Sequence, residues 1–337
     1  MTAPPADLRI ACAEKGYLAA SGSTAQQNAM AHWMEEYQAA CPGVKVRYAP
    51  LGSGAGVAQF LRGATQIGGT DGALTPDEVV RSAEVCRGGR AIDLPMVGGP
   101  IAIGYHLDGV DDLVLDASAL ARIFNSEITV WNDPAIRRLN PGVDLPPTPI
   151  SAVHRSDGSG TTQNFTAYLA GAAPKHWPYG EDKTWRAKGG VAAAGSDGLV
   201  SHVRGTNGGI GYFELSFAKK AKLHTVRLDT GGVAEPVTVS AESASAGIAQ
   251  ASVAGDGNDM TLRFDYENPA PGAWPIVLVT YEIVCDRGNR PDVLPVLRSF
   301  LTYTAGEEGQ NGLTGIHYAP LPAELAARVR QVVSSLS

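Results

Sequence analysis

The sequence predicts an α/β protein built as two lobes that are joined by two crossing strands. Short apolar runs alternate with helical patterns early in the chain, which is typical of this class. The 337 residues, of which 44% are hydrophobic, are ample for a sizeable core and indicate two lobes rather than one. Two long apolar segments, 95–107 and 274–284, are long enough to pass from one lobe to the other.

Strands and helices alternate in the first part of the chain. A short strand that ends at 18–20 leads into a helix with an apolar face around Trp33. A strand over 43–50 leads into a second helix, which carries Phe60. Residues 67–71 form another strand end, followed by a turn.

The later part of the chain continues this alternation. A strand over 150–154 feeds the polar segment 155–162, which begins a further helix. The glycine-rich stretch 205–214 ends in a strand that its neighbours approach closely. Two helices, over 293–304 and 322–336, complete the series.

The two long apolar segments divide the chain between the lobes. The chain leaves the first lobe near residue 100, builds the second lobe and returns near residue 274. The first lobe is therefore predicted to comprise 1–100 plus 275–337, and the second 101–274. A cleft between two such lobes is a natural ligand site.

Composition and charge exclude several functions. The net charge is −7 and there is no basic run, so we expect no nucleic-acid partner. No apolar stretch approaches the length of a membrane span. The histidines are scattered, so the sequence indicates neither a metal site nor a cofactor.

The four cysteines leave two interpretations open. They are Cys12, Cys41, Cys86 and Cys285, and none lies in a Cys-x-x-Cys pair or at metal-ligand spacing to a histidine. They are either buried thiols of a cytosolic protein or two disulfides of an exported one. If they are disulfides, three pairings are possible.

Three segments, 21–25, 53–56 and 159–162, share one design. In each, a strand is followed by a Ser/Thr/Gly turn and a helix, so that a hydroxyl and unpaired N–H groups lie at the positive end of the helix dipole. Ordinary N-capping explains any one of them. Three together, with Arg155 in the same turn as the third, favour a shared anion site.

Two catalytic motifs fail on their spacing. A nucleotide-binding loop needs Gly-Lys-Ser/Thr, and 160–162 has no lysine. A nucleophile elbow needs Gly-x-Ser-x-Gly, which 158–160 lacks. His154 lies beside this turn as a conceivable base for Ser159. A serine hydrolase therefore stays as a minor alternative, and we expect no catalytic residue.

Asp71 and Asp157 point to an anion that still carries a proton. An ionised carboxylate in a dry cleft can only accept hydrogen bonds. Monohydrogen phosphate and arsenate have a proton to donate, whereas sulfate at neutral pH has none. Sites built around such a bond reject analogues that lack it by roughly 10⁴–10⁵. As the alternative, each aspartate caps a turn, and Asp157 pairs with Arg155.

The anion motifs belong to a longer series that occurs in order along the chain. Its members are segments 20–26, 52–57, 123–126, 131–136, 155–162, 275–278 and 280–282. From about residue 18 onward, the chain resembles the phosphate-binding protein of high-affinity ABC phosphate importers. The Ile-Phe and Trp-Asn-Asp-Pro stretches of the series have no anion chemistry of their own, so they support the resemblance independently of the anion motifs.

The resemblance implies a two-lobed periplasmic-binding-protein fold of the second type, whose closure buries the ligand. Asp71 would take the ligand's proton, and Asp157 would hold Arg155 in place. The phosphate-binding residues carried over by position are Thr24, Ala25 (through its N–H), Ser53, Asp71, Arg155, Asp157, Ser159, Gly160 and Thr161. Thr70, Ala25 and the run 72–74 depart from the family pattern, which alters the lip of the cleft more than its donors.

The resemblance also implies a non-enzymatic, extracytoplasmic and monomeric receptor. It would deliver inorganic phosphate to the membrane subunits of an ABC permease, and lipid anchoring of a precursor stays open. A receptor for phosphite, arsenate or sulfate is the alternative. Export favours disulfides, and the pairings that we expect are Cys41 with Cys86 and Cys12 with Cys285.

Overall fold

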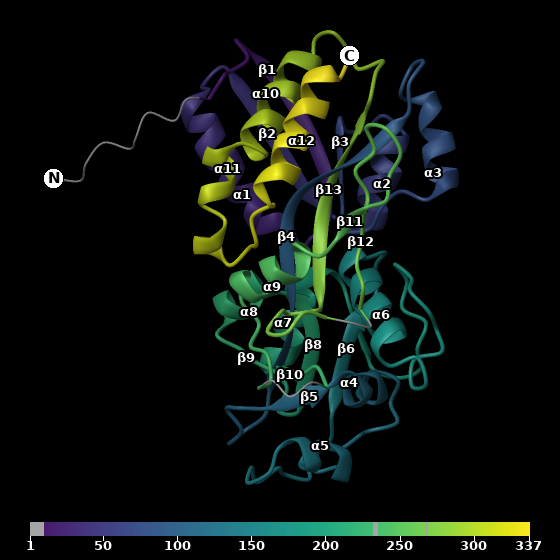
Figure 1. Ribbon diagram of the computed structural model, residues 1–337, viewed down its shortest axis with the longest axis vertical. Helices are drawn as coiled ribbons and strands as arrows, with labels where there is room; N and C mark the ends of the chain where they lie inside the picture. Colours follow the sequence, from purple (N-terminus) through teal and green to yellow (C-terminus); the bar gives the residue numbers. More distant parts are fainter. Residues whose placement is uncertain (1–9, 232–234, 267–268) are drawn as a thin grey trace, which may run out of the picture.

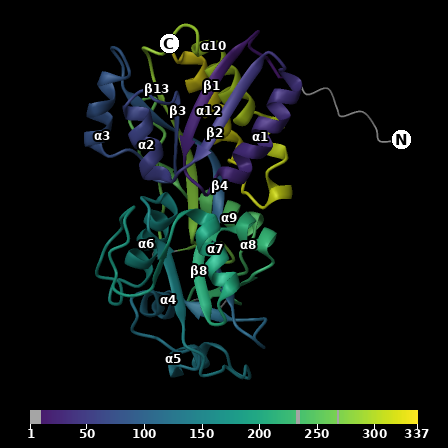
Figure 2. The same ribbon diagram turned by 180° about the vertical axis from the view of Figure 1, so that it is seen from behind.

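The computed structural model describes residues 10–231, 235–266 and 269–337. One long strand runs through both halves of the molecule (Figures 1 and 2). This strand, β4 (Ala91–His106), pairs with β13 (Val277–Cys285) over residues 91–100 and with β8 (Gly209–Glu214) over residues 101–106, in both cases antiparallel. The two halves, called the first and second lobe below, therefore share one sheet.

In the first lobe the sheet continues beyond β13 into β3 (Ile67–Thr70), β1 (Gly16–Gly22) and β2 (Val44–Pro50). These last three strands run parallel, so their carboxyl ends meet at one edge, where ligands bind in open α/β sheets. The helices of this lobe are α1 (Gln27–Ala40), α2 (Ser53–Leu61), α3 (Pro76–Arg81), η1 (Ser82–Glu84), α10 (Leu294–Thr304), α11 (Glu307–Asn311), η2 (Thr314–Ile316) and α12 (Ala323–Ser335).

In the second lobe the sheet continues from β4 through β8 and β6 to β7, and β9 also pairs with β4. Its elements are β5 (Val114–Asp116), α4 (Ala117–Phe124), α5 (Pro134–Leu139), β6 (Ser151–Arg155), α6 (Gly160–Ala172), β7 (Val191–Ala193), α7 (Gly195–Gly205), α8 (Leu215–Ala221), β9 (His224–Thr225) and β10 (Arg227–Asp229). A return segment follows, with α9 (Ala241–Ile248), β11 (Ser252–Val253) and β12 (Leu262–Arg263).

The strands that join the lobes are buried along almost their whole length. Every residue of β13 is buried, and in β4 only His106 is partly exposed. Strands covered on both faces are near-continuously apolar, which is why these two stand out in the sequence. The prediction of two long crossing strands in an α/β fold is therefore confirmed.

The return segment makes its contacts on the first lobe. Met260 N donates to Asp93 O at 3.0 Å, and Leu262 N donates to the hydroxyl of Tyr281 at 2.9 Å. Met260 and Leu262 fall within the range 101–274 that was expected for the second lobe. The division at residues 100 and 274 stays a prediction.

The disulfide pairing expected from the sequence is wrong. The structure joins Cys12 to Cys41 and Cys86 to Cys285, with Cα–Cα distances of 5.5 and 5.3 Å. The reason is strand register. Gly16 of β1 lies opposite Val44 of β2, which brings Cys12 to the end of α1. Ala91 of β4 lies opposite Cys285 of β13, which brings the preceding loop with Cys86 to the end of β13.

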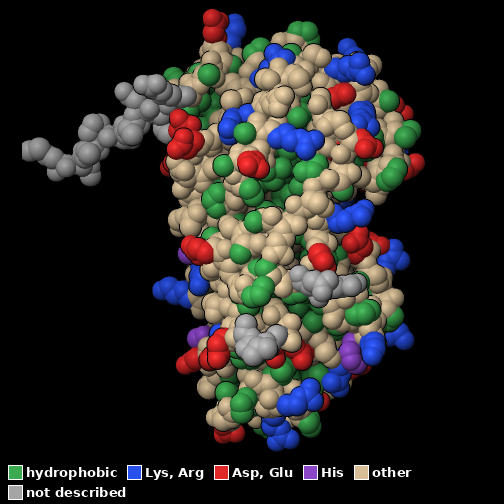
Figure 3. Space-filling view, viewed as in Figure 1, with side chains coloured by type: hydrophobic (Ala, Val, Ile, Leu, Met, Phe, Trp, Pro, Cys, Tyr) green, Lys and Arg blue, Asp and Glu red, His purple; other side chains and the backbone are tan. Residues whose placement is uncertain are grey.

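The surface offers no extended area of one charge on the face that Figure 3 shows, where acidic and basic side chains are interspersed over both lobes. Among the described residues, no helix combines the length and the apolar character needed to cross a bilayer.

Candidate functional site

Two helix starts from different lobes meet between the lobes. The first residues of α2 face the first residues of α6, and the amide of Gly54 donates to Gly158 O at 2.9 Å. The amide of Gly160 donates to Ser53 Oγ at 3.1 Å. A side chain at position 160 would have its Cβ 2.6 Å from that of Asp71 and 2.7 Å from Ser53 Oγ, so only glycine permits this approach.

Asp71 lies at the centre of this contact and is 3% exposed. It directly follows β3, and its Oδ1 accepts a hydrogen bond from Thr280 Oγ1 at 3.0 Å. Its Oδ2 has longer contacts, from Ser53 Oγ at 3.4 Å and from Thr161 Oγ1 at 3.5 Å. The carboxylate thus receives donors from both lobes.

The electrostatics at Asp71 are those of a buried acid. Burial raises its pKa, and hydrogen bonds from Ser23, Thr280 and Ser53, together with the charge of Arg155, act in the opposite direction. A carboxylate held in this way accepts hydrogen bonds from any proton donor placed beside it.

Arg155 and Asp157 form an ion pair at the second-lobe side of the site. Arg155 Nε donates to Asp157 Oδ1 at 2.7 Å, Nη2 contacts Oδ2, and the Arg155 side chain is 2% exposed. Gly195 N also donates to Oδ1, at 3.0 Å. Burial of Asp157 would raise its pKa, but the bonds from Arg155 and Gly195 outweigh burial and lower it. Both planar groups are therefore fixed in one orientation.

This ion pair adjoins the start of α2. Gly52 has a φ of +93°, and a Cβ at this position would lie 2.4 Å from Asp157 Oδ2 and 3.5 Å from Arg155 Nη2. Arg155 thereby lies beside the first-lobe helix start as well as on its own strand. The sequence expectation that Asp157 contacts Arg155 agrees with this geometry.

Thr24 and Ala25 lie in the turn before α1, which begins at Gln27. Thr24 Oγ1 lies 2.9 Å from Ser196 Oγ, a contact between the lobes. The amide of Ala25 donates to Ser23 Oγ at 3.0 Å. The structure therefore brings Thr24 to the start of α7 and gives the Ala25 amide a partner within its own turn.

Ser159 caps its own helix. Its Oγ accepts from the amide of Thr162 at 3.1 Å, the ordinary N-capping arrangement. His154 contacts the carbonyl of Arg155 through Nδ1 and stacks on Trp185, with the ring centroids 4.8 Å apart. The structure thus pairs Ser159 with Thr162 and His154 with other groups.

Sequence reasoning missed three residues of this site. Ser196 follows a glycine at the start of α7, so it repeats the strand–turn–helix design that marked the other segments. Asn164 Nδ2 donates to the carbonyl of Asp71 at 2.6 Å, one turn into α6. Thr280 lies in segment 280–282 of the series that resembles the family, but nothing in the sequence places this threonine at the site. Only the pairing of Tyr281 with Thr70 brings it beside Asp71.

The chemistry of this cluster is that of oxyanion recognition. Hydroxyls, amides and one guanidinium supply donors, and Asp71 supplies an acceptor in their midst. Within 10–231, 235–266 and 269–337, no group of three or more His, Cys, Asp or Glu residues has the arrangement of a metal site. The residues present are suited to holding an anion that donates one hydrogen bond of its own.

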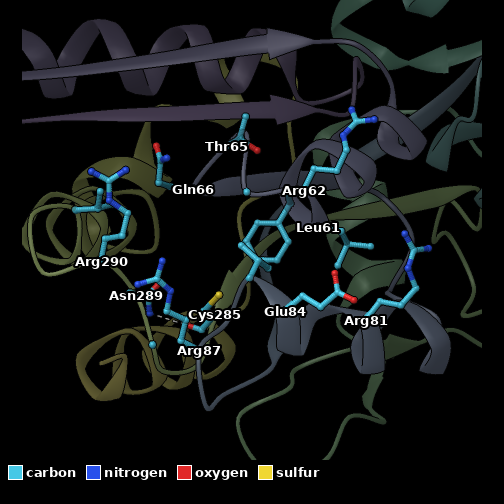
Figure 4. A pocket seen from close by; sticks show the side chains of 15 residues that line it. Leu61, Arg62, Thr65, Gln66, Arg81, Glu84, Arg87, Cys285, Asn289 and Arg290 are labelled. Carbon is cyan, nitrogen blue, oxygen red and sulfur yellow. Dashed lines mark hydrogen bonds between the residues drawn. The ribbon is translucent and has the colours of Figure 1, made fainter.

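A groove of about 600 Å³ lies elsewhere, at the opposite end of α2 from Ser53. Figure 4 shows Arg62, Arg81, Arg87 and Arg290 around it, with the guanidinium groups pointing in different directions. Arg290 is paired with Asp292. The groove is thus a surface feature distant from the cluster around Asp71.

Comparisons with known proteins agree on one family. Residues 11–308 match the model of the PBP superfamily domain. The chain is 42% identical to phosphate-binding protein PstS 3 of Mycobacterium leprae over 335 residues, which cover 99% of this chain and 90% of that protein. It is 43% identical to phosphate-binding protein PstS 2 of Mycobacterium tuberculosis over 332 residues, covering 97% and 89%.

Solved structures share the fold at lower identity. A high-affinity periplasmic phosphate-binding protein, solved with phosphate, aligns with a TM-score of 0.76 at 22% identity, covering 95% of this chain and 93% of that one. A putative phosphate ABC transporter substrate-binding protein from Clostridium perfringens, also with bound phosphate, aligns with a TM-score of 0.64 at 19% identity, covering 91% and 100%.

Proposed function

The chain belongs to the PstS family of phosphate-binding proteins within the PBP superfamily, and from that premise we propose that it captures inorganic phosphate between its two lobes for an ABC permease. The observation that carries the proposal is Asp71. A buried carboxylate among donors repels a fully deprotonated anion, but it accepts the proton of monohydrogen phosphate.

The binding residues that we propose are those at the two helix starts and the ion pair. Ser53, Gly160 and Thr161 meet around Asp71, and Arg155 adds a fixed positive charge. Thr24, Ala25 and Ser159 complete the set with hydroxyl and amide donors, which phosphate would engage in place of their present partners. Asp157 would keep Arg155 oriented through their ion pair.

Closure of the lobes is part of the proposed mechanism. The contacts of Gly54 with Gly158 and of Thr24 with Ser196 bridge the lobes directly. A ligand enclosed by both lobes is removed from water, which strengthens short hydrogen bonds to it. Release to a permease would require these contacts to open.

A receptor for sulfate is disfavoured by the same carboxylate. Sulfate would place lone pairs against Asp71, and an unpaired buried polar group costs about 1–3 kcal/mol, more when it is charged. Arsenate carries the same acidic proton and is less easily distinguished by this residue. A hydrolase is disfavoured because Ser159 is engaged by Thr162 and not by His154.

We further propose that the protein is a monomer that works outside the cytoplasm. Two disulfides join all four cysteines, and disulfides persist in oxidising compartments.

Calorimetric titration with phosphate, with and without excess sulfate, tests the proposal. We expect tight binding of one phosphate that sulfate does not displace. Absence of phosphate binding would refute the function, and strong competition by sulfate would refute the role of Asp71. The variant R155K should bind at least tenfold more weakly, because lysine cannot form the forked contact. K175A, on the exposed surface of the second lobe, is the matched control and should bind normally.

A further inference from the structure

A second buried carboxyl group, that of Glu282, lies on β13 next to β3, the strand that leads to Asp71. It projects from β13, where Glu282 is opposite Gly69 of β3 on one side and Leu94 of β4 on the other. The residue is 1% exposed. Neither carboxyl oxygen has a hydrogen-bond partner among the described residues. A buried carboxylate without donors is unstable, whereas a neutral carboxylic acid is tolerated.

The absence of a side chain at Gly69 leaves room for polar groups on this face of the sheet. A Cβ at position 69 would lie 2.1 Å from Gln26 Nε2 and 2.6 Å from the hydroxyl of Tyr48. Directly opposed residues of paired strands project to the same face, so Glu282 shares this space. Gln26 Nε2 donates to the Tyr48 hydroxyl at 2.8 Å, while Gln26 Oε1 has no partner in the described part of the chain. A protonated Glu282 is a donor of the kind that this oxygen lacks.

The same polar cluster leads to the phosphate site. The Tyr48 hydroxyl donates to the carbonyl of Ser23 at 2.7 Å, and Ser23 Oγ accepts the amide of Ala25. Among the described residues, the charge of Asp71, which follows β3, acts on Glu282, and Glu282 in turn raises the pKa of Tyr48 on β2. Burial raises the pKa of Glu282 to about 8; the nearby amide of Gln26 acts in the opposite direction, and the negative charge of Asp71 raises the pKa further.

We propose that Glu282 is a positioning residue that holds a proton whenever phosphate is bound, so that binding of phosphate above neutral pH takes up one proton from solvent at this carboxyl group. The inference rests on the proposed function. A bound dianion beside Asp71 adds negative charge in a region of low dielectric, which favours the neutral form of Glu282. The coupling is reciprocal, so a protonated Glu282 favours bound phosphate to the same extent.

The direction of the pH dependence follows from this linkage. Below the pKa of the free protein, Glu282 already carries its proton, and binding leaves its ionisation unchanged. Above that pKa, binding requires uptake of a proton, so the affinity falls as the pH rises. One linked proton gives at most a tenfold loss of affinity per pH unit.

The experiment is calorimetric titration with phosphate at pH 6 to 9.5 in buffers of different ionisation enthalpy, which counts the protons exchanged on binding. Phosphate contributes its own ionisation equally to every variant. The wild type should take up more protons than E282Q above about pH 8. Its affinity should fall by up to tenfold per pH unit relative to that variant. D93N is the matched control, because Asp93 is a buried acid with a raised pKa on the adjacent strand, and Asp71 is not among the charges acting on it. D93N should match the wild type.

Equal proton uptake by the wild type and E282Q would overturn the inference while leaving phosphate binding in place. Failure of the wild type to bind phosphate at any pH would instead overturn the proposed function. If E282Q does not fold, infrared difference spectra of the wild type with ¹³C-labelled glutamate replace it. Addition of phosphate at pH 9 should then increase the carbonyl band of a protonated glutamic acid, and an unchanged band would refute the inference.

Discussion

The hydroxyl of Thr280 donates to Oδ1 of Asp71 at 3.0 Å, although 209 residues separate them in the sequence. This bond occupies one oxygen of the carboxylate from within the first lobe. The other oxygen, Oδ2, faces Ser53 and Thr161 at longer distances and is the one that a ligand proton would reach. Thr280 therefore sets the orientation in which Asp71 meets the second lobe.

Removal of the Thr280 hydroxyl should weaken phosphate binding. T280V leaves Oδ1 of Asp71 without its donor and lets the carboxylate rotate. A hydrogen bond to a charged group contributes about 1.5–3 kcal/mol, so we expect a loss of affinity of about tenfold or more. Calorimetry measures it. T280S keeps a hydroxyl and should stay close to the wild type, and equal losses in both variants would contradict the assigned bond.

Replacement of Asp71 by asparagine should reduce the selectivity for phosphate over sulfate. D71N offers an amide that can donate to sulfate, so the penalty against sulfate falls while the contact with the phosphate proton weakens. Phosphate affinity should fall by about 10–100-fold, the equivalent of about 1–3 kcal/mol. Competition titrations measure the ratio of the two affinities. D77N, in the exposed first turn of α3, is the control. An unchanged ratio in D71N would contradict the role of the carboxylate.

Loss of the Asp157 charge should destabilise the fold in a pH-dependent manner. D157N leaves the buried guanidinium of Arg155 without its counter-ion, which costs about 3 kcal/mol in comparable pairs. The pKa of Asp157 is lowered in the folded protein, so its contribution is present above the unfolded pKa of about 3.9 and is lost as the pH falls through the folded value. Urea denaturation should therefore show a large difference between D157N and wild type at pH 7 and a smaller one at pH 3. A constant difference would argue against the ion pair.

The buried acids of the first lobe should make stability fall with rising pH. The pKa of Glu282 is raised to about 8 and that of Asp93 to about 7. Each group ionises at a lower pH in the unfolded chain than in the folded protein. The free energy of unfolding therefore decreases as the pH rises from the pKa of the unfolded chain to that of the folded protein. E282Q should gain roughly 3–5 kcal/mol relative to wild type between pH 4 and pH 8. The gain of D93N should end near pH 7. Chemical denaturation across this range measures both, and parallel wild-type and E282Q curves would contradict the assignment.

The two disulfides should differ in their effect on stability. Cys12–Cys41 spans 29 residues and Cys86–Cys285 spans 199. In the chain-entropy estimate, their loss costs about 4 and about 5 kcal/mol. C86S/C285S should therefore unfold at lower denaturant concentration than C12S/C41S. Mass spectrometry of unreduced peptides checks the pairing, and a Cys41–Cys86 peptide would contradict the structure.

The parts of the site that the sequence could predict are those encoded by local motifs. A hydroxyl residue after a strand and before a helix marks the starts of α2 and α6, and the spacing of Arg155 and Asp157 already places their side chains within reach of each other. The capping of α6 by Ser159 was the ordinary alternative, and the structure contains it. Local sequence patterns therefore predicted the helix starts and also ordinary N-capping as the alternative to anion binding.

The parts that could not be predicted depend on strand register. Thr280 reaches Asp71 only because Tyr281 pairs with Thr70, and no local pattern encodes that pairing. Cys12 meets Cys41 because β1 and β2 are parallel with Gly16 opposite Val44. Glu282 lies in a predicted apolar strand, and its place in the polar cluster depends on the space left by Gly69. Each of these contacts can be predicted only when the position of a strand distant in the sequence is known.

The Cys86–Cys285 disulfide protects a geometry that lies far from it. It joins the loop that precedes β4 to the end of β13, and β4 and β13 are the two strands that connect the lobes. A slip of one residue between paired strands turns every side chain to the opposite face. Such a slip would carry Thr280 away from Asp71 and turn Glu282 out of its polar cluster. In the proposed opening and closing of the lobes, this disulfide would let the two strands bend and twist but would oppose their sliding, so that Thr280 and Asp71 would keep the same alignment.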